Sequence, residues 1–229
     1  MKKNVILMVA VAAMLFVSAG IRAEEEKREV SDFDKVSLAI PADMEISQGS
    51  VESLILSGSK SDLEKIVTKV ENGNLKIYKK KGTSNLGDVK IALSIKELKD
   101  LSIAGSGDVK FITDFNTDDF ELSIAGSGDV ECNKISANKV EISVAGSGDV
   151  MMGGVTEDEL EISIAGSGDV NASGLKCREV EVSIAGSGDA RVWAEEMLDA
   201  SIVGSGNVYY KGRPLVKSEA TGSGSTQPL

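Results

Sequence analysis

The sequence predicts an all-β protein, a parallel β-helix or solenoid whose coils are about 18–21 residues long. Three observations predict it: a repeated octapeptide, alternation of apolar and polar residues around the octapeptide, and no helical periodicity within the repeats. The first glycines of the repeats, with a last one at position 222, are spaced by 21, 20, 20, 20, 18 and 18 residues. The octapeptide, Ser-Ile-Ala-Gly-Ser-Gly-Asp-Val and its variants, begins at Ser102, Ser123, Ser143, Ser163, Ser183 and Ser201.

The residues on both sides of each Gly-Ser-Gly corner alternate as they do in β-strands. In the segment from Val140 to Val144, the apolar side chains share one face and Glu141 and Ser143 share the other. Each repeat is therefore predicted to hold a strand, a corner, a second strand and a return leg. The columns predicted to point inward are Phe120, Val140, Leu160 and Val180; Leu122, Ile142, Ile162 and Val182; Ile103, Ile124, Val144, Ile164, Ile184 and Ile202; Val109, Val130, Val150, Val170, Ala190 and Val208; Phe111, Cys132, Met152, Ala172, Val192 and Tyr210; and Ile135, Val155 and Leu175.

Stacking of the repeats is expected because one repeat cannot bury its own apolar face. Each strand then pairs in parallel with its equivalent one coil away, at about 4.8 Å. Three apolar sides in every coil indicate a closed cross-section, and the crossover preference of parallel strands predicts a right-handed coil. The corner glycines are expected to adopt backbone torsions that a Cβ atom would resist.

Residues 1–23 are predicted to form a signal peptide. Lys2 and Lys3 precede an apolar run over residues 5–17, and cleavage is expected after Ala19 or Ala23. The alternative, an uncleaved anchor, is disfavoured because the run is shorter than the ~20 residues that span a bilayer. We therefore expect an exported protein, periplasmic or at the cell surface, with no membrane span after cleavage.

Residues 24–100 are predicted to form irregular N-terminal β coils and a cap, and residues 101–229 the regular repeats. Several segments before residue 100 alternate like strands. Residues 61–66 are compatible with one capped helical turn, and Glu71-Asn72-Gly73-Asn74 has the composition of a hairpin turn.

Four motifs in this order carry a resemblance to a known family: Phe33-Asp34-Lys35-Val36, Ile46-Ser47-Gln48-Gly49, Leu75-Lys76-Ile77 and the repeated octapeptide. The chain resembles the DUF2807 family, named for a putative auto-transporter adhesin, head GIN domain. The resemblance covers nearly the whole chain after the predicted signal peptide. It implies an exported parallel β-helix with an adhesin-like role.

The net charge of −11 limits the classes of partner. After cleavage at Ala23 the chain would carry 36 acidic against 22 basic residues, a net charge of −14. Such a surface repels nucleic acids and anionic lipid headgroups. We expect an unidentified protein or glycan as partner, and the solenoid ends favour a homo-oligomer.

A column of acidic residues is the candidate metal site. Carboxylates stacked about 4.8 Å apart repel one another unless something compensates. One reading is calcium held by oxygen ligands; the other is that each carboxylate accepts hydrogen bonds from corner amides, which the Asn207 that ends the column would also do. The column consists of Asp108, Asp129, Asp149, Asp169 and Asp189.

A face of small outward side chains is the candidate binding face. Small side chains in register make a flat surface that suits a docking partner, self-association or a glycan, although small residues are also simply tolerated beside a tight corner. Its central members are Ser123, Ser143, Ser163, Ser183, Ala125, Ala145, Ala165 and Ala185.

Catalytic signatures are not found in the sequence. There is no histidine, no Gly-x-Ser-x-Gly and no P-loop. Cys132 and Cys177 lie two coils apart in different columns, so two free thiols are predicted, with Cys132 buried. The sequence therefore favours a non-catalytic, adhesin-like or envelope-associated module without a cofactor. The alternatives are a polysaccharide-active enzyme on the same scaffold and a calcium-stabilised solenoid.

Overall fold

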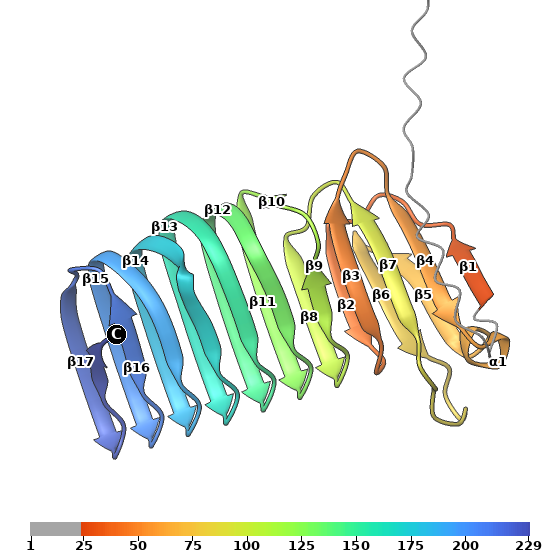
Figure 1. Cartoon of the computed structure of the whole chain (residues 1–229). Helices are drawn as coiled ribbons and strands as arrows, with labels where there is room; N and C mark the ends of the chain where they lie inside the picture. Colours follow the sequence, from red (N-terminus) through yellow and green to blue (C-terminus); the bar gives the residue numbers. More distant parts are fainter. Residues whose placement is uncertain (1–23) are drawn as a thin grey trace, which may run out of the picture.

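Stacked parallel coils make up most of the molecule. The structure is a computed structural model that describes residues 24–229, so the predicted signal peptide lies outside the described residues. It is 68% strand and 2% helix, and its coils form a β-solenoid of about 6 turns, about 20 residues apart (Figure 1). The predicted all-β parallel solenoid is confirmed.

The central coils are long strands that bend around the solenoid between successive corners. Neighbouring coils pair in parallel with the octapeptides in register, so that Ser143 pairs with Ser163 and Ser163 with Ser183. The strands of the repeat region are β8 (Asp100–Gly105), β9 (Val109–Phe111), β10 (Phe115–Asn116), β11 (Asp119–Gly126), β12 (Val130–Gly146), β13 (Val150–Gly166), β14 (Val170–Gly186), β15 (Ala190–Gly204), β16 (Val208–Lys211), β17 (Leu215–Gly222) and β18 (Thr226–Pro228).

The predicted inward columns form the core, with one wrong assignment. Val155 was expected to point inward beside Ile135 and Leu175, but it is 48% exposed. Gly154 takes the inward place instead, pairing with Ile135 on one side and Leu175 on the other. The register shifts in this region turn Val155 outward, and the next residue, Thr156, is buried with no hydrogen-bond partner for its hydroxyl oxygen.

The corners are tight because backbone stacks directly on backbone. Gly146 has φ of 136°, and a Cβ atom on it would lie 2.1 Å from the carbonyl oxygen of Gly126. The same carbonyl oxygen accepts a hydrogen bond from the Ser147 amide at 2.9 Å. The predicted need for glycine at this corner is confirmed.

The first coils do not stack in sequence order. Strand β2 (Lys35–Ala39) lies between β8 and β6 (Asn74–Lys79), and β3 (Asp43–Gln48) lies between β9 and β7 (Lys90–Ile95). The coil of β2 and β3 therefore packs between a later coil on each side. One continuous sheet system joins the irregular coils to the regular repeats.

Antiparallel strands close the N-terminal end. Strand β4 (Ser53–Gly58) pairs with β7, β1 (Glu24–Arg28) pairs with β4, and β5 (Ile66–Glu71) pairs with β6. The predicted hairpin turn is present between β5 and β6, with Asn72 and Gly73 both at positive φ. One helical turn is present as α1 (Lys60–Leu63), which ends earlier than the predicted 61–66 because β5 begins at Ile66; its N-cap Ser59 accepts a hydrogen bond from the Asp62 amide. No helix in residues 24–229 is long and apolar enough to cross a membrane.

Candidate functional site

The serine and alanine columns lie side by side on the outer face of β8 and β11–β15, next to the corners. We call this surface the serine–alanine face. The alanines are exposed and the serines from Ser102 to Ser183 are half-buried, so both columns face outward. A shallow groove of about 790 Å³ runs over this face, from Ser37 and Ala39 of β2 to Ser201 and Val203 of β15.

The groove spans seven coils, from the coil of Ser37 to that of Ser201, or roughly 29 Å at about 4.8 Å a step. Serine hydroxyls alternate with alanine methyl groups, and aliphatic residues such as Ile124 and Ile164 contribute to the floor. Its lining has no charged side chain. A surface of this kind can hold an extended partner by shape and by scattered hydroxyl contacts, but its lining supplies no acid or base for a proton transfer.

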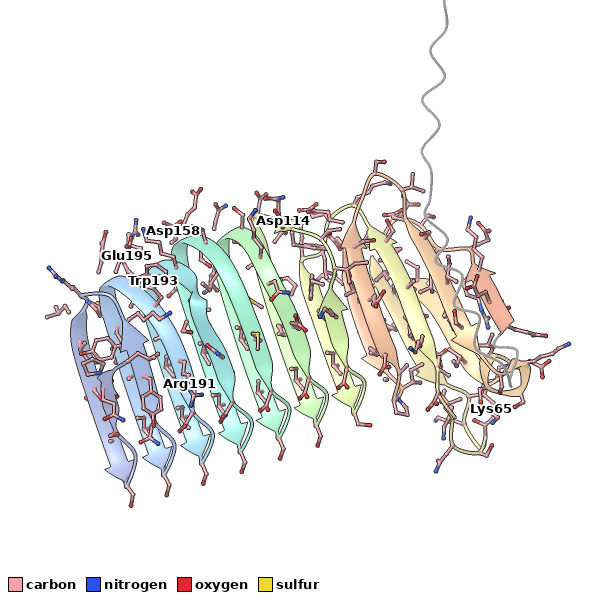
Figure 2. The ribbon with its side chains drawn as sticks, in the orientation of Figure 1. Lys65, Asp114, Asp158, Arg191, Trp193 and Glu195 are labelled. Atoms are coloured by element: carbon pink, nitrogen blue, oxygen red, sulfur yellow. The ribbon has the colours of Figure 1, made fainter. Side chains whose placement is uncertain are left out.

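The opposite edge of each coil, along the return legs, is charged. Asp114, Asp158 and Glu195 lie along this edge, away from the corners (Figure 2). Lys134 pairs with Asp114, and Lys176 pairs with Glu195 at 2.9 Å. These pairs are exposed, so each stabilises the fold only weakly.

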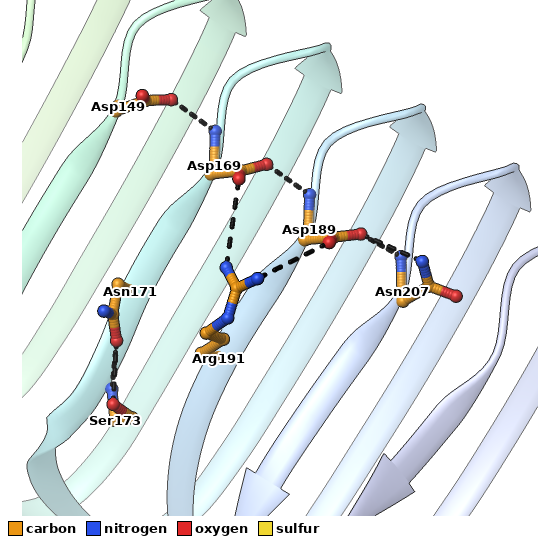
Figure 3. A network of polar contacts seen from close by, with 7 residues as sticks. All are labelled: Asp149, Asp169, Asn171, Ser173, Asp189, Arg191 and Asn207. Atoms are coloured by element: carbon orange, nitrogen blue, oxygen red, sulfur yellow. Dashed lines mark hydrogen bonds and ion pairs between the residues drawn. The ribbon is translucent and has the colours of Figure 1, made fainter. Parts of the chain in front are cut away.

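The aspartate column forms a hydrogen-bonded ladder. The Oδ1 atom of each aspartate accepts a hydrogen bond from the backbone amide of the next member, at 3.0 Å between Asp108 and Asp129 and at 2.8 Å in each later step. Figure 3 shows the steps from Asp149 to Asn207. Asn207 ends the ladder by donating its amide to Asp189. The carboxylates thus satisfy corner amides, as one of the two readings predicted, with the acceptor and the amide in successive coils.

Calcium binding by the aspartate column stays a prediction. In residues 24–229, no group of three or more His, Cys, Asp and Glu side chains is placed to hold a metal ion. One oxygen of each carboxylate from Asp108 to Asp189 is already used by an amide of the next coil. One basic side chain compensates two C-terminal members, because Arg191 lies 3.8 Å from Asp169 and 3.7 Å from Asp189.

Both cysteines are free and buried, which confirms the prediction of two thiols without a disulfide and the burial of Cys132. Burial raises the pKa of Cys132 to about 12 and that of Cys177 to about 11. Both side chains therefore stay protonated at neutral pH. Because the thiolate is the nucleophile, neither cysteine is suited to catalysis.

A family model described as "putative auto-transporter adhesin, head GIN domain" (DUF2807) matches residues 32–214. The chain belongs to the DUF2807 family. A protein described as a putative lipid binding protein from Parabacteroides distasonis ATCC 8503 has a similar solved structure: 31% identity, TM-score 0.72, 90% of this chain and 96% of that chain covered.

Two putative adhesins share the fold of this DUF2807 chain. The one from Bacteroides fragilis NCTC 9343 has 24% identity and a TM-score of 0.84, with 92% of this chain and 98% of that chain covered. The one from Parabacteroides merdae ATCC 43184 has 20% identity and a TM-score of 0.71, with 91% and 96% covered. No curated protein matches the chain.

A group of aromatic and basic side chains on the last coils of this DUF2807 chain was not predicted from the sequence. Arg191 lies over the ring of Tyr209, and Lys211 lies over the ring of Trp193. A signal for this group was present in the sequence. Only three aromatic residues follow Phe120 in the sequence, and all three lie where the repeat shortens to 18 residues: Trp193, Tyr209 and Tyr210.

Proposed function

We propose that this DUF2807 protein is an exported, non-catalytic, adhesin-like module that holds a protein or glycan partner on the serine–alanine face. The observation that carries the proposal is the uncharged groove of about 790 Å³ across seven coils. Repetition of the same side chains in every coil suits contact with an extended partner better than reaction at one point. The adhesin descriptions of the family and its structural relatives support the same role.

The groove is tested by lysine substitutions that fill it. Lysine at Ser143 and Ser163 would place two long charged side chains over the alanine methyl groups, and desolvating them opposes docking. We expect Ser143→Lys/Ser163→Lys to lower the affinity for the partner at least tenfold. The loss is measured as the binding of fluorescently labelled protein to arrays of purified polysaccharides, extracellular proteins and lipids.

A matched control adds the same two charges to another face. Ser136 and Asn138 are exposed on the return leg of β12, so Ser136→Lys/Asn138→Lys should leave binding unchanged. Equal binding by the groove variant and by this control would exclude the serine–alanine face. Antibody labelling of intact cells, compared with permeabilised cells, tests the surface location that an adhesin requires.

Acyl chains are a second candidate class of partner. The groove floor is largely aliphatic, with Leu38, Ile103 and Val144 among its lining residues, and one relative is described as a putative lipid binding protein. Apolar ligands bind where such surface is removed from water. Binding to the lipid spots of the same array, lost in the groove variant, would favour this class over glycans and proteins.

A further inference from the structure

In each repeat, one outward-facing side chain lies in the middle of the strand that follows the corner. The chemistry of this column of side chains changes along the solenoid. Its N-terminal members are Glu45, Lys110, Glu131 and Met151, which are charged or flexible. Its C-terminal members are flat polar groups in adjacent coils: an amide, a guanidinium, a phenol and a second amide. We call this set the planar row; it consists of Asn171, Arg191, Tyr209 and Gln227.

Neighbouring side chains hold the planar row in place and leave donors free. The Asn171 Oδ1 atom accepts hydrogen bonds from the amide and the hydroxyl of Ser173, at 3.2 and 2.8 Å (Figure 3). Because the Ser173 amide can only donate, the Asn171 oxygen must face it, and the Nδ2 group is left to donate elsewhere. Arg191 sits 3.7–3.8 Å from Asp189 and Asp169, which orients the guanidinium by charge.

Two aromatic rings border these donors. The Arg191 guanidinium carbon lies 5.2 Å from the centroid of the Tyr209 ring. Lys211 lies 5.8 Å from the centroid of the Trp193 ring and donates to the Ser173 carbonyl at 3.0 Å, so a chain of contacts links Trp193 to Asn171. Trp193 and Tyr209 are half-buried, and part of each ring therefore faces solvent.

A groove reaches the planar row at Asn171 and Arg191. A groove of about 590 Å³ follows the aspartate ladder, and Asp169, Asn171 and Arg191 line its C-terminal end. Aromatic rings offer apolar platforms, while the amide, guanidinium and carboxylates offer hydrogen-bond donors and acceptors. A sugar ring presents both kinds of surface, with C–H groups on its faces and hydroxyl groups around its rim.

We propose that the planar row, with Trp193, is a binding site for a neutral saccharide chain. Sugar rings stack on Tyr209 and Trp193, and hydroxyl groups bond to Asn171, Arg191 and the free oxygens of the aspartates. Arg191 and Lys211 balance the carboxylates of Asp169 and Asp189 within the site, but the net charge of −11 of the whole chain disfavours an anionic saccharide. This site lies on a different face from the serine–alanine groove and acts independently of it.

The single tryptophan reports on this site directly, because Trp193 is the only one in the chain. The protein is titrated with neutral polysaccharides (laminarin, mannan, xyloglucan and dextran) and with anionic polygalacturonate, with Trp193 emission and native affinity gels as readouts. We expect at least one neutral polysaccharide to shift the emission and retard the protein. Tyr209→Ala should weaken that binding at least tenfold.

Tyr78→Ala is the matched control. Tyr78 is an exposed tyrosine (38%) at the other end of the molecule, so its loss should leave binding unchanged. Ser143→Lys/Ser163→Lys should also leave it unchanged, which separates this proposal from the serine–alanine face. The proposal is overturned if no neutral polysaccharide binds, if polygalacturonate binds more tightly, or if Tyr209→Ala and Tyr78→Ala behave alike while circular dichroism shows both folded.

Discussion

Each corner glycine from Gly126 onward lies against the carbonyl oxygen of the equivalent glycine one coil earlier. At Gly146 two demands coincide: a positive φ of 136° and a place for Cβ that is only 2.1 Å from the Gly126 oxygen. At Gly105 only the positive φ applies: φ is 118°, but no atom lies within 4 Å of the place that a Cβ atom would take. The two positions therefore distinguish backbone strain from steric clash.

Alanine substitution at these two glycines should give different losses of stability. Gly105→Ala introduces strain alone and should lower the free energy of unfolding by about 1–3 kcal/mol. Gly146→Ala adds a clash with backbone that cannot move without separating two coils, so its loss should be larger. Guanidinium unfolding followed by circular dichroism measures both. Equal losses would mean that the coils separate at little cost.

Residue-level prediction from the sequence succeeds where alternation is unbroken and fails at an irregularity. From Val140 to Val144 every second side chain is buried, as the pattern predicts. After Gly153 and Gly154 the alternation no longer predicts which side chains are buried: Val155 points outward and Thr156 inward. The sequence shows two glycines there, but it does not show which of them takes an inward place.

At the scale of elements, the aspartate ladder continues the hydrogen bonding of the sheet beyond the strand ends. Backbone hydrogen bonds link successive corners, as from the Ser147 amide to the Gly126 carbonyl oxygen, and the carboxylate of one coil also accepts the amide of the next, as between Asp149 and Asp169 at 2.8 Å. The acceptor needs an oxygen but no charge. Asn207, at the end of the ladder, accepts from the hydroxyl of Ser225 at 2.9 Å with its amide oxygen.

Replacement of Asp149 separates the two properties of the carboxylate. Asp149→Asn keeps the oxygen acceptor and removes one of the stacked charges, so stability should be unchanged or slightly higher. Asp149→Ala leaves the Asp169 amide without its acceptor and should cost about 1 kcal/mol. Melting temperatures in calcium and in chelator complete the test. If calcium raises the melting temperature and Asp149→Asn abolishes that rise, the column binds calcium.

The two candidate faces differ in how far the sequence could predict them. The serine–alanine face follows from alternation around a repeated octapeptide, because period two fixes which residues share a side. The column of the planar row follows from the same alternation, since it stands between the inward columns of Ala190 and Val192. The ring contacts of the group do not follow from it, because the register shifts between Ala172 and Lys176 and places Trp193 beside Lys176.

At the scale of the whole molecule, the out-of-order coil joins the two halves of the chain. Strand β2 covers β8, and β3 covers β9, so residues 35–48 bury the first regular coil. Alternation alone could not predict this order, since it shows which side chains of a strand are buried but not which strands lie beside it. Leu101, Ile103, Val109 and Phe111 owe their burial partly to this cover.

Removal of the N-terminal coils should therefore destabilise the regular repeats. A chain of residues 101–229 would expose the edges of β8 and β9 together with the apolar side chains behind them, and open strand edges favour aggregation. We expect a lower melting temperature than for residues 24–229, with aggregation visible by size-exclusion chromatography. Removal of residues 215–229 is the matched control. All eight residues of β17 are exposed, so this loss should be smaller. A fragment 101–229 that melts like the longer chain would show instead that the repeats fold without their N-terminal cover.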